Sequence, residues 1–143
     1  MNRRRKRIKM TEESQAINYL GHPIIGFSGH RNKTCHPDYL FNILYTYNNA
    51  VWVHGGAKNG FDFQVSKFCK DHNIREIIVR PRYEDYKNRN LSPTKALLDR
   101  NIEIVEIVST MYFLYDGRTK GGTFYTLEYA KKQNKRYNLI PLD

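Results

Sequence analysis

Five short apolar segments recur along this chain, and each is separated from the next by a stretch long enough to hold a helix. Each segment is short enough for a buried strand and too short for a helix. No Asn-Gly hairpin turn joins one segment directly to the next, so the connections favour parallel strands with crossover helices. The pattern predicts a single α/β domain with an open, doubly wound, mostly parallel sheet flanked by helices. The five segments are residues 24–27, 51–53, 77–79, 111–114 and 138–140.

Four of the intervening stretches are predicted to be helical. Pro37 is suited to the first turn of a helix, and we expect Asp62 and Thr123 to act as N-caps. Residues 82–93 are polar and long for a connection, so we expect a functional loop there. The positions expected to be buried on three of the helices are Leu40, Phe41, Leu44 and Tyr45; Phe61, Val65, Phe68 and Cys69; and Leu97, Leu98, Ile104, Val105 and Val108.

The positive charge of the chain is concentrated at its start. The 143 residues carry a net charge of +10, yet six of the 24 basic residues lie within residues 1–10, where there is no acidic residue. The remaining 18 basic residues face 14 acidic ones. We therefore expect residues 1–20 to be a basic, flexible tail and residues 21–143 to form the domain. The tail is either a solvated arm or a binding site for nucleic acid or another polyanion.

Several classes of protein are excluded by the composition. A hydrophobic content of 40% with 13% aromatic residues suffices for a core, which argues against disorder of the whole chain. No apolar run approaches the roughly 18–20 residues that span a bilayer, and no apolar segment follows the basic start as in a secretory signal. Cys35 and Cys69 cannot form a disulfide scaffold and lack the spacing of a zinc site. We expect a cytoplasmic protein without metal, cofactor or membrane partner. The content of Asn, Lys, Ile and Tyr suggests an AT-rich coding genome and, weakly, a viral one.

Three predicted loops that follow a strand and precede a helix combine glycines with basic residues. In an open parallel sheet such loops lie at the carboxyl ends of the strands, where ligands bind at the point of reversed strand order. Glycines let a ligand oxygen approach the backbone amides, and a helix start offers unpaired N–H groups. The three loops therefore predict a site for an anion, most simply a phosphate. Neither GxGxxG nor GxxxxGK[ST] occurs, so the common dinucleotide and P-loop fingerprints are missing.

Five short motifs in a fixed order resemble the YspA/YpsA-related branch of the SLOG superfamily. They are SGHR at 28–31, HGGAKNGFD at 54–62, ALLDRN at 96–101, YDG at 115–117 and KGGT at 120–123. The resemblance covers about residues 24 to 141. It implies a Rossmann-like domain related to the Lonely-Guy phosphoribohydrolases, which cleave the N-glycosidic bond of nucleoside 5′-monophosphates. Other members are thought to sense or process nucleotide-derived ligands, including those of antiviral signalling, and related domains commonly form homo-oligomers.

The resemblance assigns roles to several residues. Arg100 and Asn101 match the helix position whose arginine acts on substrate in the Lonely-Guy enzymes, and the pair 122–123 matches their phosphate-binding Gly-Thr. The catalytic glutamate of those enzymes corresponds to Thr126 here. Glu128 is present two residues further on, which turns it about 200° around a helix. Arg100 and Glu128 are thus the catalytic candidates if the protein is an enzyme, and binding is favoured over catalysis.

The candidate site also contains residues with an alternative structural role. Asp62 either bonds a ribose or only caps its helix, and His30 and His54 either donate to a phosphate or only border their loops. We expect Tyr83 and Tyr86 to cover the ligand and Trp52 to lie in the core. The residues expected to bind the ligand are Ser28, Gly29, His30, Arg31, Gly55, Gly56, Ala57, Lys58, Asp62, Arg100, Asn101, Asp116, Gly117, Gly121, Gly122 and Thr123.

The leading hypothesis is therefore a binding protein for a nucleotide or nucleotide-derived ligand. It would sense that ligand or withdraw it from solution, as in antiviral or anti-defence signalling. The first alternative is a hydrolase that cleaves the N-glycosidic bond of a nucleoside phosphate. The second is nucleic-acid binding through the basic tail.

Overall fold

A computed structural model of the protein describes residues 21–142, so the predicted basic tail lies outside the described residues. Five strands, all parallel, form one sheet in the order β3-β2-β1-β4-β5. This arrangement confirms the predicted single α/β domain with a parallel sheet between helices. The elements in chain order are β1 (Ile24–Gly29), α2 (Pro37–Thr46), β2 (Val51–His54), α3 (Gly60–Asp71), β3 (Arg75–Ile78), α4 (Tyr83–Asn88), α5 (Pro93–Ile107), β4 (Thr110–Leu114), α6 (Gly122–Lys132) and β5 (Arg136–Ile140).

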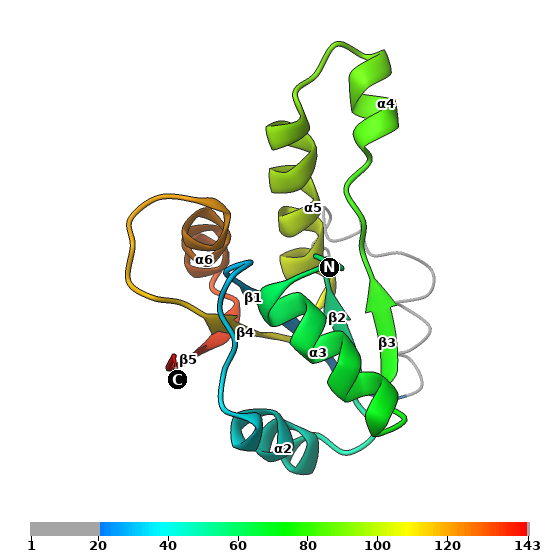
Figure 1. Ribbon diagram of the computed structural model, residues 1–143, viewed down its shortest axis with the longest axis vertical. Coiled ribbons are helices and arrows are strands. Elements are labelled where there is room, and N and C mark those ends of the chain that lie inside the picture. Colours follow the sequence, from blue (N-terminus) through cyan, green and yellow to red (C-terminus); the bar gives the residue numbers. More distant parts are fainter. Residues whose placement is uncertain (1–20, 143) are drawn as a thin grey trace.

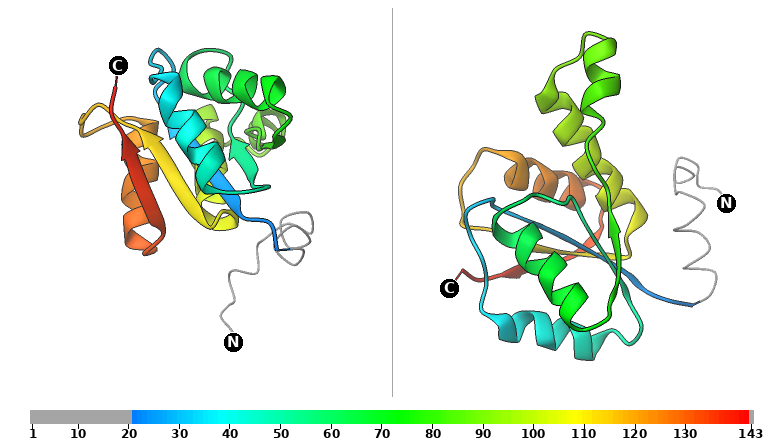
Figure 2. Two further views of the ribbon diagram at one scale, coloured as in Figure 1. Left: turned by 90° about the horizontal axis from the view of Figure 1, so that it is seen from below. Right: turned by 45° about the vertical axis from the view of Figure 1, so that its right-hand side comes forward.

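The order of the strands reverses at β1, in the centre of the sheet. The chain first builds outward through β2 to β3, then returns through α5 to place β4 on the other side of β1. Helices α2 and α3 cover one face of the sheet, and α5 and α6 cover the other (Figures 1 and 2). The connections after β1 and β4 therefore leave the sheet toward opposite faces, which opens a crevice at the carboxyl ends of these two strands.

The core consists of two apolar clusters, one on each face of the sheet. Successive strand residues point to opposite faces, so Ile24 packs on the α5–α6 side and Ile25 on the α2–α3 side. Trp52 is fully buried on the α2–α3 side, stacked on Phe68 with ring centroids 5.4 Å apart. The prediction that Trp52 belongs to the core is confirmed.

The buried face of α2 differs from the prediction by one position. Leu40 and Ile43 are buried, Phe41 and Leu44 are partly buried, and Tyr45 is 77% exposed. The predicted stripe used the right period, but the sequence of the helix is apolar on more than one side. In the structure Ile43, which the prediction left out, is buried against the sheet, and Tyr45 faces solvent instead.

Two predicted N-caps and one predicted loop are wrong. The N-cap of α3 is Asn59 and that of α6 is Gly121, so Asp62 and Thr123 are the third and second residues of their helices. Gly121 has φ +99°, a backbone conformation that glycine adopts without strain. The polar stretch 82–93 contains the short helix α4 rather than only a loop. None of the helices in residues 21–142 is both long enough and apolar enough to cross a membrane.

Replacing Phe113 with alanine should destabilise the fold strongly. Phe113 is fully buried in β4, beside Ser28 of β1 and Leu139 of β5 in the sheet. We expect Phe113→Ala to lower the free energy of unfolding by about 3–5 kcal/mol. Urea denaturation followed by the fluorescence of the single tryptophan measures this. Phe63→Ala, at a side chain that is 55% exposed, is the control and should change stability by less than about 0.5 kcal/mol.

Candidate functional site

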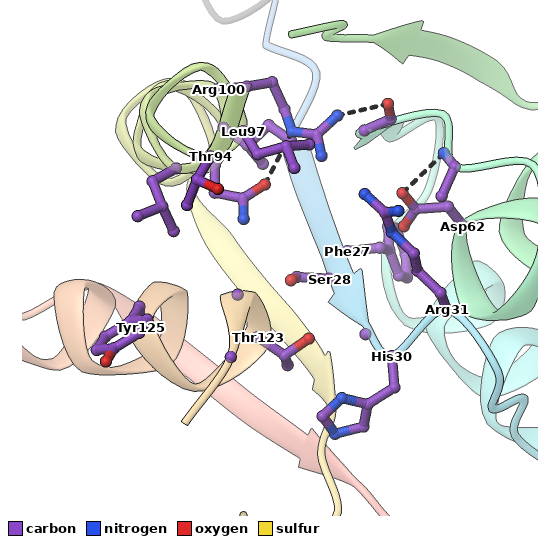
Figure 3. A pocket seen from close by; sticks show the side chains of 18 of the residues that line it. Phe27, Ser28, His30, Arg31, Asp62, Thr94, Leu97, Arg100, Thr123 and Tyr125 are labelled. Atoms are coloured by element: carbon purple, nitrogen blue, oxygen red, sulfur yellow. Dashed lines mark hydrogen bonds between the residues drawn. The ribbon is translucent and has the colours of Figure 1, made fainter. Parts of the chain in front are cut away.

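A cavity of about 490 Å³ opens at the carboxyl ends of the central strands, where the strand order reverses (Figure 3). Its walls come from the end of β1 and the loop after it, the loop after β2 with the start of α3, one face of α5, and the loop after β4 with the first turn of α6. Four regions that are distant in the sequence thus meet at one place. The parallel topology produces this meeting, because each segment follows or faces the same edge of the sheet.

Most of the predicted ligand-binding residues line this cavity. Gly56, Lys58, Asp116 and Gly117 do not line it. The predicted residues that do are Ser28, Gly29, His30, Arg31, Gly55, Ala57, Asp62, Arg100, Asn101, Gly121, Gly122 and Thr123.

The sequence interpretation missed a wall of the cavity contributed by α5. Thr94, Leu97, Leu98 and Ile104 line it together with Arg100 and Asn101. Their spacing of three and four residues is that of one helix face, and this signal was present in the sequence. The sequence predicts the apolar members to be core residues, whereas in the structure the same helix face continues beyond the sheet and lines the cavity. The other missed lining residues are Phe27, Asn32, Arg118 and Tyr125.

Arg100 ties α5 to the strands on the opposite side of the cavity. Its Nη1 donates to the carbonyl oxygens of Gly55, at 2.6 Å, and Val79, at 3.2 Å. Its Nε donates to Asn101 Oδ1 at 2.8 Å. Burial lowers the pKa of this guanidinium, and the negative charge of Asp62 opposes that shift. An arginine stays protonated in a protein, so a positive charge is held in the cavity wall.

Gly55 lacks a side chain because Arg100 needs the space. A Cβ on Gly55 would overlap the Arg100 guanidinium. The next two amides of this loop are also occupied, since Gly56 N–H donates to His54 Nδ1 at 3.0 Å and Ala57 N–H donates to Asp62 Oδ2 at 3.1 Å. The amides of Gly56 and Ala57 thus bond side chains of the protein, and the approach of a ligand oxygen to the glycine amides of this loop stays a prediction.

His54 has a structural role in the loop after β2 and does not line the cavity. It is fully buried, and its Nε2 lies 2.5 Å from Glu76 Oε2. Because Nδ1 accepts from Gly56 N–H, the proton of the neutral ring is on Nε2, which donates to Glu76. This pair holds the loop after β2 in place rather than reaching the cavity.

The first turn of α6 presents open hydrogen-bond donors to the cavity. Gly121 caps the helix without a side chain, so the leading N–H groups of Gly122 and Thr123 have no side-chain partner there. The Thr123 side chain points into the cavity in Figure 3, and the residue is only 7% exposed. Its hydroxyl makes no hydrogen bond with any described residue. A buried hydroxyl without a partner beside a helix start fits an anion, which would also be stabilised by the helix dipole.

His30 lies in the same wall and contacts Asp116. Its Nε2 is 3.2 Å from the Asp116 N–H and 3.2 Å from Asp116 Oδ1, so the ring either accepts from the first or donates to the second. Burial lowers the pKa of His30, and the Asp116 carboxylate only partly offsets this. The reason is that Arg118 holds that carboxylate through Nε, at 3.0 Å from both carboxylate oxygens, and through Nη2. These bonds also keep the pKa of Asp116 well below its usual range.

Three of the expected covering or catalytic residues lie away from the cavity. Glu128 lines a separate groove and pairs with Lys131 at 3.4 Å. Thr126, at the position of the family's glutamate, donates its hydroxyl to Gly122 O at 2.7 Å. Tyr86 donates to Asp99 Oδ2 at 2.6 Å, and neither Tyr83 nor Tyr86 lines the cavity. Within residues 21–142 no three histidine, cysteine or acidic side chains are grouped as metal ligands.

Comparison with known proteins supports the fold and goes little further. No protein family matches the chain, and no curated protein is similar in sequence. Among solved structures, the X-ray structure of DNA processing protein A (DprA) from Streptococcus pneumoniae is similar, with a TM-score of 0.61 and 15% identity. The match covers 86% of this chain and 52% of the DprA chain, so this chain spans about half the length of DprA. At this identity the similarity shows the Rossmann-like α/β fold alone, and membership of the SLOG superfamily and of its YspA-related branch stays a prediction.

Gly55→Ala should destabilise the protein through Arg100. We expect a loss of about 1–3 kcal/mol in the free energy of unfolding, because the new methyl group displaces the guanidinium. In Arg100→Ala the same substitution should have a smaller effect, and the double-mutant cycle should give a coupling above about 0.5 kcal/mol. Gly122→Ala is the control, since its Cβ would meet nothing closer than 3.7 Å. Additive effects of the two substitutions would contradict this account.

His30 should make stability depend on pH below neutrality. Its pKa is lowered in the folded protein, so between that pKa and about 6.5 the unfolded chain binds more protons and stability rises with pH. Urea denaturation at pH 5 to 8 should therefore show stability falling below about pH 6.5. His30→Gln should reduce this slope. His36→Asn is the control, because it alters an exposed histidine and keeps an N-cap side chain. An unchanged slope in His30→Gln would contradict the assignment.

Proposed function

We propose that the protein binds a phosphorylated nucleoside in the cavity, with the phosphate at the first turn of α6. The observation that carries this proposal is the buried Thr123 hydroxyl, which lacks a partner among the described residues and lies at an uncapped helix start. The N–H groups at positions 122 and 123 are further donors there, and the His30 ring lines the same cavity. A phosphate supplies the several acceptor oxygens that such a group of donors requires.

The charge of the cavity supports an anionic ligand. Arg31, Arg100 and Arg118 line it, against one acidic side chain, Asp62. The Nη1 and Nε groups of Arg100 donate hydrogen bonds within the protein, while its Nη2 has no partner among the described residues. Arg118 is 44% exposed, so its guanidinium is accessible from solution. An excess of arginines at a partly enclosed site strengthens attraction to a phosphate.

The remaining walls suit a nucleoside. Leu97 and Leu98 form an apolar surface on α5, and Tyr125 offers an aromatic ring at the edge of the cavity. One carboxylate oxygen of Asp62 accepts from Ala57 N–H, and the other has no partner within the described chain. That oxygen suits a ribose hydroxyl. A flat base against apolar side chains and a sugar at a carboxylate are the usual environment of a bound nucleotide.

Binding is favoured over hydrolysis of the N-glycosidic bond. Hydrolysis of the expected type needs a carboxylate next to the reacting carbon. Glu128 lies outside the cavity, and Asp62, which does line it, already accepts a hydrogen bond from the β2 loop. A protein with these features would sense a nucleotide or withdraw it from solution. The similar fold of a DNA processing protein is compatible with nucleotides as the ligand class.

Calorimetric titration with the four nucleoside 5′-monophosphates and with the matching nucleosides tests the proposal. We expect at least one monophosphate to bind and its nucleoside to bind at least tenfold more weakly, because the phosphate carries the charge. Thr123→Val removes the hydroxyl at nearly constant volume and should weaken binding about tenfold or more, since a hydrogen bond to a charged group contributes about 1.5–3 kcal/mol.

Arg118→Gln should weaken binding of the monophosphate more than binding of the nucleoside. Two variants serve as controls and should bind normally. Thr46→Val changes an exposed threonine whose hydroxyl bonds only its own helix, and Arg89→Gln changes the arginine at the C-cap of α4, whose side chain is 60% exposed. Equal binding of nucleoside and monophosphate, or no binding of any monophosphate, would refute the proposal.

A further inference from the structure

A second hollow adjoins the cavity along the seam between α5 and α6. It has a volume of about 280 Å³ and shares Leu98 and Tyr125 with the cavity. Ile102 and Tyr129 extend its walls away from the cavity, and Glu128 and Lys132 also line it. We call this hollow the α5–α6 groove. Because Leu98 and Tyr125 line both, the groove and the cavity are neighbours, and a ligand that occupies both must pass over these two side chains.

The chemistry of the groove suits a second aromatic group joined to something charged. Tyr125 is 52% exposed, so its ring is accessible to a ligand from solution. The Tyr129 ring is held in place because its hydroxyl donates to Glu106 Oε2 at 2.7 Å. Aromatic side chains of this kind stack on bases of any sequence.

The charges at the groove favour a nucleotide over a purely apolar partner. Lys132 forms no ion pair with any described residue, whereas its neighbour Lys131 pairs with Glu128. An ammonium group without a partner beside two tyrosines can bind a phosphate that links two nucleosides. The Glu128 carboxylate can accept from a sugar hydroxyl or from the amino group of a base.

We infer that the ligand is a dinucleotide, whose first nucleoside 5′-phosphate occupies the cavity and whose second nucleoside lies in the α5–α6 groove. This inference rests on the proposed function. The same chemistry is offered by a free dinucleotide and by the 5′ end of a single strand. In either case the second nucleoside stacks on Tyr125 or Tyr129, and Ile102 and Leu98 form the apolar floor beneath it.

The test compares the affinity of the mononucleotide that binds best with the affinity of the 5′-phosphorylated dinucleotide of the same base. If the base is adenine, the two ligands are AMP and pApA. We expect the dinucleotide to bind at least tenfold more tightly. Ile102→Ala and Lys132→Gln change residues that line the groove and not the cavity. Each should weaken dinucleotide binding at least fivefold and leave the mononucleotide unchanged. Lys67→Gln, at an exposed lysine on α3, is the matched control.

The outcomes separate the two proposals. Equal affinities of mononucleotide and dinucleotide, or equal losses for both ligands in Ile102→Ala, overturn the dinucleotide and leave the cavity proposal standing. Failure of every mononucleotide and dinucleotide to bind overturns both. A single-stranded decanucleotide with the same 5′-phosphate distinguishes the two sources of the ligand. If the decanucleotide binds more weakly than the dinucleotide, the ligand is a free dinucleotide. If it binds equally or more tightly, the ligand is the 5′ end of a strand.

A second copy of the chain is the competing occupant of the groove. Sedimentation equilibrium of the wild type and of Ile102→Ala detects it. A dimer that Ile102→Ala dissociates, together with no gain for the dinucleotide, would show that the groove is an interface and would overturn the inference.

Discussion

The hydrogen bond from the Arg100 guanidinium to the Gly55 carbonyl is the contact on which the cavity depends. It joins α5 to the carboxyl end of β2, and the second bond to Val79 O extends the connection to the end of β3. No acidic side chain forms an ion pair with Arg100 among the described residues, so backbone carbonyls solvate the charge. Removing that solvation would leave a buried cation unsatisfied, which is costly. The cavity wall and its positive charge are therefore one structural unit.

The position of the cavity follows from the order of the strands. Since β1 lies at the centre and the chain crosses from β3 to β4 on its other side, α5 passes over the edge where β1, β2 and β4 end. The start of α6 then faces α5 across the carboxyl end of β1 (Figure 3). Donors on α6, cations from three segments and an apolar helix face meet because of this crossing. The side chains add specificity to a space that the connectivity already provides.

The strands and the location of the cavity were predictable from the sequence. The contacts of individual residues in the cavity wall were predictable only in part. Short apolar segments between helical stretches can hardly be anything but parallel strands, and loops after such strands must share an edge. The role of Gly55 could not be deduced, because the residue that needs its missing side chain is 45 positions away in the chain. Similarly, Asp62 looks like an N-cap by type, but it accepts from Ala57, outside the helix it was expected to cap. Tertiary contacts decided both cases.

Helix α4 has a consequence for how the molecule opens. It buries no side chain and projects beyond the sheet at the end of an arm formed with the start of α5 (Figure 1). The Tyr86–Asp99 hydrogen bond and the Arg82–Glu103 ion pair join α4 and its start to α5, and the two apolar clusters contain no residue of α4. Segments of this kind unfold locally at low free energy while the rest of the domain stays intact. The turn between α4 and α5 is therefore the place where the chain can tolerate an insertion or a first proteolytic cut without losing the sheet.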